Sequence, residues 1–225
     1  MTFKEFKTNI RKKIGWIGIG EFSDDPLASN SVESWNTFFN NKRFLKNYIE
    51  PKRLSFYSEL VCKINMNLEL KNSKSLIDMG CGTGHLLSEI QKHNPHLKLT
   101  GSDFSEQAIV VAKKTLPNAI FLSCDLYNIS EDLVGKYDIV ICTEVLEHLL
   151  YPEKAIANLM KLFSKGKGYL ILSVPNGRRD TYEGHINFWS PESWRVFIEY
   201  NCPKNEVEYS LIDNKMTNLA IIKLL

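Results

Sequence analysis

The sequence predicts an α/β fold built on a mostly parallel seven-stranded sheet. From residue 75 onward, short apolar runs typical of strands alternate with segments whose apolar residues recur at helical spacing. The stretch 75–87 also has the pattern of a strand, a glycine-rich turn and a helix, which directs backbone N–H groups toward a ligand cleft. This alternation is typical of parallel strands whose sheet is covered by helices on both faces.

The elements expected after residue 70 follow from these runs in chain order. The last two strands flank Asp213-Asn214-Lys215, a turn sequence, and therefore predict an antiparallel C-terminal hairpin. We expect strands at 75–79, 97–102, 118–123, 137–142, 168–174, 206–212 and 217–225, helices at 83–93, 105–115, 152–164 and 191–200, and a helical turn at 129–134.

Residues 1–70 are expected to form a helical extension to a domain that spans residues 71–225. Residues 1–14 have the spacing of a short basic amphipathic helix, 32–48 form an aromatic-dense helical stretch, and Pro51 opens a further helix. We expect this extension to form a lid over the cleft, although its aromatic side chains could simply pack on the sheet.

The composition excludes several classes of protein. An apolar fraction of 44% over 225 residues can fill a sizeable core, and a net charge of +2 gives no strong nucleic-acid signal. The five cysteines show no C-x-x-C pair, which predicts reduced thiols. No apolar run reaches membrane-spanning length and no signal-peptide pattern is present, so a cytoplasmic protein is expected. The oligomeric state stays open.

The spacing of the glycines in the turn distinguishes two kinds of nucleoside site. Gly80, Gly82 and Gly84 alternate, whereas the dinucleotide fingerprint G-x-G-x-x-G would need its third glycine one position later. An acidic residue, Asp103, ends the next predicted strand. Together with Asp78 before the turn, this run resembles motif I of the class I S-adenosylmethionine (SAM)-dependent methyltransferases. The resemblance implies their Rossmann-like fold, with SAM as the cofactor.

The resemblance also implies roles for residues that follow the first four strands. Asp103 would accept hydrogen bonds from both ribose hydroxyl groups, Asp125 from the adenine amino group, and the Leu126 backbone N–H would donate to the adenine ring. Asp125 could instead cap a turn, and Phe104 either covers the adenine or belongs to the core. We expect Asp78 to order the glycine loop through backbone hydrogen bonds. The implied cofactor-binding residues are Asp78, Gly80, Cys81, Gly82, Gly84, Asp103, Phe104, Asp125, Leu126 and Thr143.

A Glu-x-x-Glu-His run follows the fourth predicted strand. If its turn is helical, Glu144, Glu147 and His148 share a face, and His185 in a later loop points to the same rim. The run is similar to that of ubiquinone-type O-methyltransferases and of small-RNA 2′-O-methyltransferases, which add a later histidine as a metal ligand. These four residues are therefore candidate ligands of a divalent metal ion. Alternatively, the two glutamates serve the cofactor or its loop and each histidine acts singly as a general base.

The resemblance implies an enzyme, a SAM-dependent methyltransferase that transfers a methyl group to an oxygen or a nitrogen of a small-molecule acceptor. The candidate catalytic residues are His148, His185 and Glu144. An RNA or polysaccharide methyltransferase is the first alternative, and the weak net charge argues against long nucleic acids. A non-catalytic SAM-binding subunit is a second alternative. A nucleotide-binding oxidoreductase is a third, which the glycine spacing disfavours.

Overall fold

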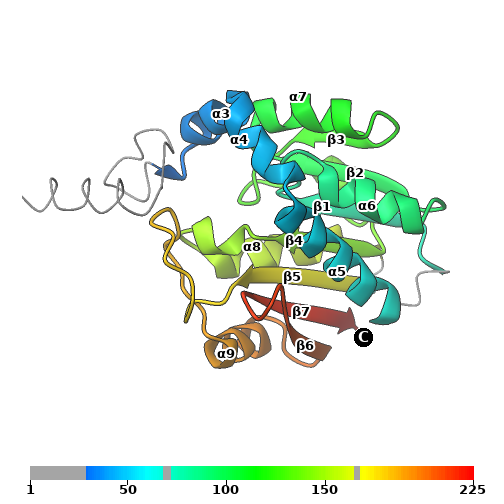
Figure 1. The fold of residues 1–225 in the computed structure, drawn as a ribbon. Coiled ribbons are helices and arrows are strands. Elements are labelled where there is room, and N and C mark those ends of the chain that lie inside the picture. Colours follow the sequence, from blue (N-terminus) through cyan, green and yellow to red (C-terminus); the bar gives the residue numbers. More distant parts are fainter. Residues whose placement is uncertain (1–28, 68–71, 165–167) are drawn as a thin grey trace, which may run out of the picture.

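The computed structural model describes residues 29–67, 72–164 and 168–225, so the helix predicted at 1–14 lies outside the described residues. Its centre is a seven-stranded sheet with the order β3-β2-β1-β4-β5-β7-β6 (Figure 1). Strands β1 to β5 are parallel, and β7 runs antiparallel to both β5 and β6. The predicted sheet and C-terminal hairpin are thus confirmed. The strands are β1 (Ser75–Met79), β2 (Lys98–Asp103), β3 (Ile120–Ser123), β4 (Ile139–Thr143), β5 (Gly168–Pro175), β6 (Glu206–Ile212) and β7 (Thr217–Leu224).

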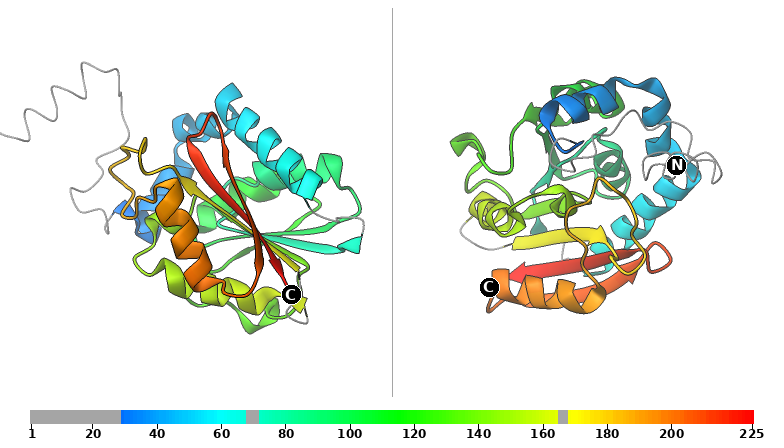
Figure 2. Two further views of the ribbon diagram at one scale, coloured as in Figure 1. Left: turned by 90° about the horizontal axis from the view of Figure 1, so that it is seen from below. Right: turned by 90° about the vertical axis from the view of Figure 1, so that its left-hand side faces the viewer.

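Helices cover both faces of the sheet, as Figure 2 shows from below. Neighbouring residues of β1 explain why both faces are apolar: Leu76 is buried against one helical layer and Ile77 against the other, because successive strand side chains point to opposite faces. The first layer contains α5 (Pro51–Asn67), α6 (His85–His93) and α7 (Glu106–Thr115), and the second contains α8 (Pro152–Leu159) and α9 (Pro191–Asn201).

The aromatic stretch at 32–48 is helical, and it consists of three short helices. It divides into α3 (Val32–Asn40), α4 (Lys42–Leu45) and the 3-10 helix η1 (Lys46–Ile49). The break occurs at Asn41, whose backbone is extended and whose side chain accepts the N–H of Arg43, so that one residue ends α3 and begins α4. The rings of Phe38 and Phe44 then stack across the break.

Three further 3-10 helices complete the described chain: η3 (Glu131–Leu133), η4 (Leu146–His148) and η5 (Met160–Leu162). The helix predicted at 152–164 therefore ends early and continues as η5. All five cysteines are unpaired, as predicted. In the described ranges, no helix combines the length and the apolar character needed to cross a bilayer.

The order of the strands fixes where a ligand can bind. The chain moves outward from β1 to β3 and then returns to place β4 on the other side of β1. In such sheets the loops after the two central strands diverge and leave a crevice at their carboxyl ends. Here α3 and η1 lie over that crevice (Figure 1).

Candidate active site

A cavity of about 660 Å³ occupies the carboxyl edge of the sheet beneath α3 and η1. Nine of the ten residues implied as cofactor-binding line it, and so do the four candidate metal ligands. Gly84 is the exception, since it caps α6 and packs against Ala112 and Phe121 behind the loop. The size suits a small ligand pair in one site.

The glycine loop has the shape that its sequence predicts. Gly80 has a φ of +83°, and a Cβ atom there would lie 2.3 Å from Val145 Cγ2. Gly82 also has a positive φ, and its N–H donates to Asp103 Oδ2 over 2.9 Å. Only glycine satisfies both constraints at position 80 without strain.

Asp103, and not Asp78, orders this loop. Asp103 accepts the N–H groups of Gly82 and Ser105, one on each carboxylate oxygen, and burial raises its pKa to about 6 against the opposing effect of these two bonds. Each oxygen can accept a further hydrogen bond, so a ribose could still bind there. Asp78 Oδ1 is buried and lacks a hydrogen-bond partner among the described residues. Burial, with the charge of Asp103, raises the pKa of Asp78 to about 8.

Asp125 makes the local turn that the sequence left open, and it also lines the cavity. Its Oδ1 accepts the N–H of Tyr127 over 2.9 Å, which makes a local turn. The residue nevertheless lines the cavity beside Leu126 and Phe104, at the end of β3. The turn therefore holds the carboxylate at the rim and does not remove it from the site.

Arg53 enters the cavity from α5. It lies near Glu144, over the ring of Phe56 at 5.5 Å, and no hydrogen bond or ion pair from its guanidinium to another described residue is present. Burial lowers the pKa of Arg53, but its interactions with Tyr57 and Glu144 raise the pKa by more than burial lowers it. The net shift is upward, so the guanidinium stays charged. A partly buried cation without a direct partner among the described residues suits an anionic ligand, which would offset the cost of its desolvation.

A second group of polar residues lies across the cavity. Glu147 Oε1 is 3.9 Å from His148 Nε2 and 3.8 Å from His185 Nε2, and the two imidazole rings are 4.6 Å apart. The Glu147 side chain is only 1% exposed, and its Oε2 has no hydrogen-bond partner within the described ranges. The ligand atoms of these three residues all lie within 4.8 Å of one another.

The far nitrogen of each ring is held by a loop partner. His185 Nδ1 is 2.5 Å from Asp180 Oδ2, and His148 Nδ1 is 3.3 Å from the Gly184 carbonyl oxygen. Because an oxygen acceptor faces each Nδ1, we assign the proton to Nδ1, which leaves the Nε2 lone pairs directed toward Glu147. Burial, with the charge of His185, lowers the pKa of His148 to about 3, so this ring is neutral.

This donor set fits a divalent metal ion. Two neutral imidazoles and a carboxylate are ligands that first-row transition metals accept, and each imidazole already has a partner at its other nitrogen. In the absence of a cation, burial and the nearby Glu144 raise the pKa of Glu147 well above its usual range. The orphaned Oε2 is the oxygen that such a cation would satisfy.

Glu144 lies outside this cluster, which corrects the prediction that Glu144, Glu147 and His148 share a face. That prediction required a helical turn from residue 144, but Glu144 has a φ of +56° and η4 begins only at Leu146. Its Oε1 accepts the Ser173 hydroxyl group over 2.9 Å. Burial raises the pKa of Glu144, and the charge of Arg53 opposes that rise.

Comparisons with known proteins show similarity to methyltransferases. Residues 77–168 match the family model described as a methyltransferase domain. The mitochondrial ubiquinone biosynthesis O-methyltransferase of Saccharomyces cerevisiae is 30% identical over 144 residues, which cover 61% of this chain and 44% of that protein. These matches support a class I SAM-dependent methyltransferase domain in this chain. SAM is the cofactor of this family. The chain spans about half the length of the curated relatives it matches.

Solved structures share the fold of this chain. The plantazolicin methyltransferase BpumL in complex with SAH has a TM-score of 0.65 at 18% identity, over 96% of this chain and 99% of that chain. The small RNA methyltransferase HEN1 has a TM-score of 0.64 at 19% identity, over 74% of this chain and 25% of that chain. At such identities the likeness concerns the fold alone.

Two residues of this candidate site, Arg53 and Asp180, were not predicted from the sequence. Arg53 lies in a helix outside the motif region, and a single arginine near a helix start carries no ligand signal. Asp180 lies five positions before His185 in a segment without helix or strand, so their contact depends on the path of the loop. An acidic residue shortly before a candidate histidine was the only available sign of it.

Proposed function

We propose that this chain transfers a methyl group from SAM to an oxygen atom of a small-molecule acceptor. The observation that carries the proposal is that one cavity contains both the glycine loop with Asp103 and the cluster of Glu147, His148 and His185. A cofactor in the first half and an acceptor in the second would meet in a single enclosed space.

In the cofactor half, each part of SAM has a suitable partner. The loop amides and the partly buried guanidinium of Arg53 suit the methionyl carboxylate, since Arg binds a carboxylate with two parallel hydrogen bonds. Asp103 suits the ribose hydroxyl groups, and Asp125 with Leu126 suits the adenine. The partially unpaired Asp78 lies in the same wall and could face the positively charged amino group.

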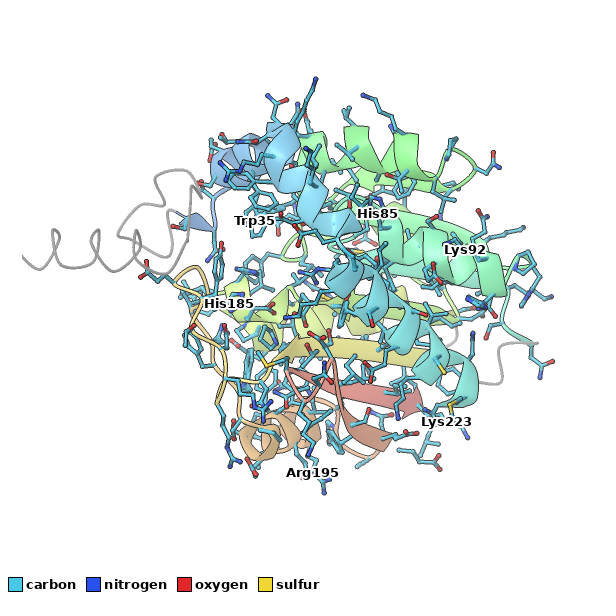
Figure 3. The ribbon with its side chains drawn as sticks, viewed as in Figure 1. Trp35, His85, Lys92, His185, Arg195 and Lys223 are labelled. Carbon is cyan, nitrogen blue, oxygen red and sulfur yellow. The ribbon has the colours of Figure 1, made fainter. Side chains whose placement is uncertain are left out.

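In the acceptor half, the polar cluster is enclosed by apolar side chains. Trp35 of α3 approaches His148 edge-on with ring centroids 5.2 Å apart, and Figure 3 shows it at the same end of the molecule as His185. Phe38 and Leu149 add to this wall. We take the N-terminal extension as the lid of the site, with α3 as the part that contacts the acceptor.

The chain itself needs only to align the two reactants and to exclude water. SAM supplies a methyl group already activated by its sulfonium. The chain must hold an acceptor oxygen in line with it, and such alignment contributes about 7–11 kcal/mol to lowering a barrier. The closed lid also keeps water away from the reacting atoms.

We further propose that Glu147, His148 and His185 hold a divalent metal ion. When bound, the ion would lower the pKa of an acceptor hydroxyl group. If no ion binds, His185 is the better general base of the two histidines, because Asp180 can stabilise its protonated ring while burial holds the pKa of His148 near 3. With a metal ion or with His185 as the base, the acceptor hydroxyl group loses its proton on the same side of the cavity.

The test is methyl transfer from radiolabelled SAM to a panel of phenols, catechols, alcohols and amines by the metal-free and the metal-supplemented protein. We expect transfer to a hydroxyl compound that is lost in His185→Ala and reduced by a chelator. Lys92→Ala, an exposed change on α6, is the control. Transfer to amines alone, or full activity in both the chelated protein and His185→Ala, would contradict the proposal.

RNA is a second candidate acceptor. The observation in its favour is that the Glu-x-x-Glu-His run and the later His185 are similar to the pattern of small-RNA 2′-O-methyltransferases. The net charge of +2 weighs against a long RNA, since phosphate contacts require many cations. The salt dependence separates the two: activity on RNA falls steeply with added salt, whereas transfer to an uncharged small molecule changes little.

A further inference from the structure

The carbonyl oxygen of Gly184 joins α3 to the histidine cluster. It accepts a hydrogen bond from Asn30 Nδ2 over 2.8 Å and faces His148 Nδ1 at 3.3 Å. Gly184 is buried, so this oxygen depends on protein donors. One donor, His148, belongs to the site. The other, Asn30, belongs to the N-terminal extension and lies 154 positions before Gly184 in the sequence.

A second contact from the same segment reaches the same ring. Trp35, one turn into α3, places its ring edge-on to His148 with an interplanar angle of 86°. α3 is in turn fixed at its other side, because Asn36 Oδ1 accepts the Ser105 hydroxyl group over 2.7 Å at the start of α7. The segment is therefore held on both sides of the cavity and touches His148 both directly and through Gly184.

The bond from His148 to Gly184 is the weaker of the two that this carbonyl receives. At 3.3 Å it lies at the long end of the range for hydrogen bonds, whereas the 2.8 Å bond from Asn30 is short. The direction of the carbonyl is thus set mainly by Asn30. The direction of this carbonyl decides whether Nδ1 of His148 carries the ring proton. When Nδ1 carries it, the lone pair of Nε2 is free to accept a proton or bind a metal ion.

We propose that Asn30 is a positioning residue for His148. By holding the Gly184 carbonyl, it keeps the proton of His148 on Nδ1 and the lone pair of Nε2 directed at Glu147. The N-terminal segment then orients a side chain of the cluster, in addition to lying over the cavity. This inference rests on the proposed role of the cluster as a metal or proton-accepting site.

The test replaces Asn30 by Asp, which has the same shape but no side-chain donor. Nitrogen-15 NMR of the imidazole rings in the metal-free protein reports which nitrogen of His148 is protonated. We expect Nδ1 to carry the proton in the wild type and Nε2 to gain a share in Asn30→Asp. A cobalt(II) titration followed by visible absorption should show affinity about 2- to 10-fold weaker, the value of one neutral hydrogen bond.

Asn40→Asp provides the matched control, because it makes the same change at an exposed position of α3. It should leave both the ring spectrum and the cobalt affinity unchanged. Asn30→Ala is the second variant, used if Asn30→Asp does not fold as judged by circular dichroism. The affinity for S-adenosylhomocysteine (SAH) should be unchanged in both Asn30 variants, since a general loss of the lid would weaken it.

The outcomes separate this inference from the proposed function. If Asn30→Asp and Asn30→Ala keep the wild-type ring spectrum, the inference is overturned, whatever the cobalt result. If the wild type binds no cobalt, the metal proposal fails, while the ring spectra still decide the role of Asn30. A shift of the His148 proton in the Asn30 variants and not in Asn40→Asp supports it.

Discussion

Asp180 and His185 form the shortest polar contact around the candidate site, with Oδ2 and Nδ1 2.5 Å apart. The Asp180 side chain is 8% exposed and that of His185 is 11% exposed, so water competes little for this contact. Burial lowers the pKa of His185, and the hydrogen bond and charge of Asp180 oppose that change. The pair orients the ring so that Nε2 faces Glu147.

The first prediction concerns this pair. Asp180→Asn keeps the shape of the side chain but removes its charge, and we expect methyl transfer to fall about 10- to 100-fold, as is typical for the outer partner of a ligating or catalytic histidine. The loss should fall on kcat more than on the KM for SAM. Glu192→Gln, an exposed change in the first turn of α9, should leave the rate as in the wild type. A normal rate and pH profile in Asp180→Asn would remove the pair from the mechanism.

The second prediction concerns Arg53. Truncation to Ala removes a charge-assisted hydrogen bond to the carboxylate of SAH, worth about 1.5–3 kcal/mol, so SAH should bind about 10- to 100-fold more weakly. Adenosine has no carboxylate, and its affinity should not change. The neighbouring exposed Lys52→Ala is the control. Equal losses for SAH and adenosine would mean that Arg53 supports the fold of the site and not the carboxylate.

The third prediction uses the pKa of Asp103, which is raised to about 6 by burial. Ribose hydroxyl groups donate to the carboxylate, so they favour its ionised form, and SAH affinity should rise as the pH is raised from 5 to 7. Calorimetric titration at several pH values measures this. Asp103→Asn should bind SAH more weakly and without that pH dependence. A dependence that persists in Asp103→Asn would assign it to another group.

The fourth prediction concerns stability without ligands. The pKa of Asp78 is about 8 in the folded chain, against 3.8 ordinarily, so the folded state holds its proton more tightly than the unfolded state does. That stabilisation is complete below about pH 4 and is lost as the pH rises toward 8. The melting temperature should therefore fall between pH 5.5 and about 8.5, and fall less in Asp78→Asn. The exposed Asp132→Asn should follow the wild type; an unchanged slope in Asp78→Asn would exclude this source.

The sheet was predictable because each strand has a local sequence pattern of its own. Apolar runs such as 139–143 are bounded by polar residues, and the alternating glycines fix the place of the first turn. The residues after the strands, Asp103 and Asp125 among them, then fall at one edge by topology alone. The predicted boundaries differ from the structure by only a few residues.

The errors in the site share a physical cause, namely conformations that neighbouring residues do not determine. Glu144 leaves the cluster because one residue adopts a left-handed φ, and the loop amide of Gly82 selects Asp103 over Asp78 because of three-dimensional proximity. Arg53 and Asn30 reach the cavity only after the N-terminal helices pack on the sheet. Such contacts depend on tertiary structure and have no signature in the sequence.

The most direct test of the account is calorimetric titration of the purified chain with SAH. The account predicts one saturable site per chain, competed by SAM and weakened by Asp103→Asn and Arg53→Ala alike. If SAH produces no binding signal in folded protein, or if NAD binds there and SAH does not, the cavity is not a SAM site and the proposed methyl transfer is wrong.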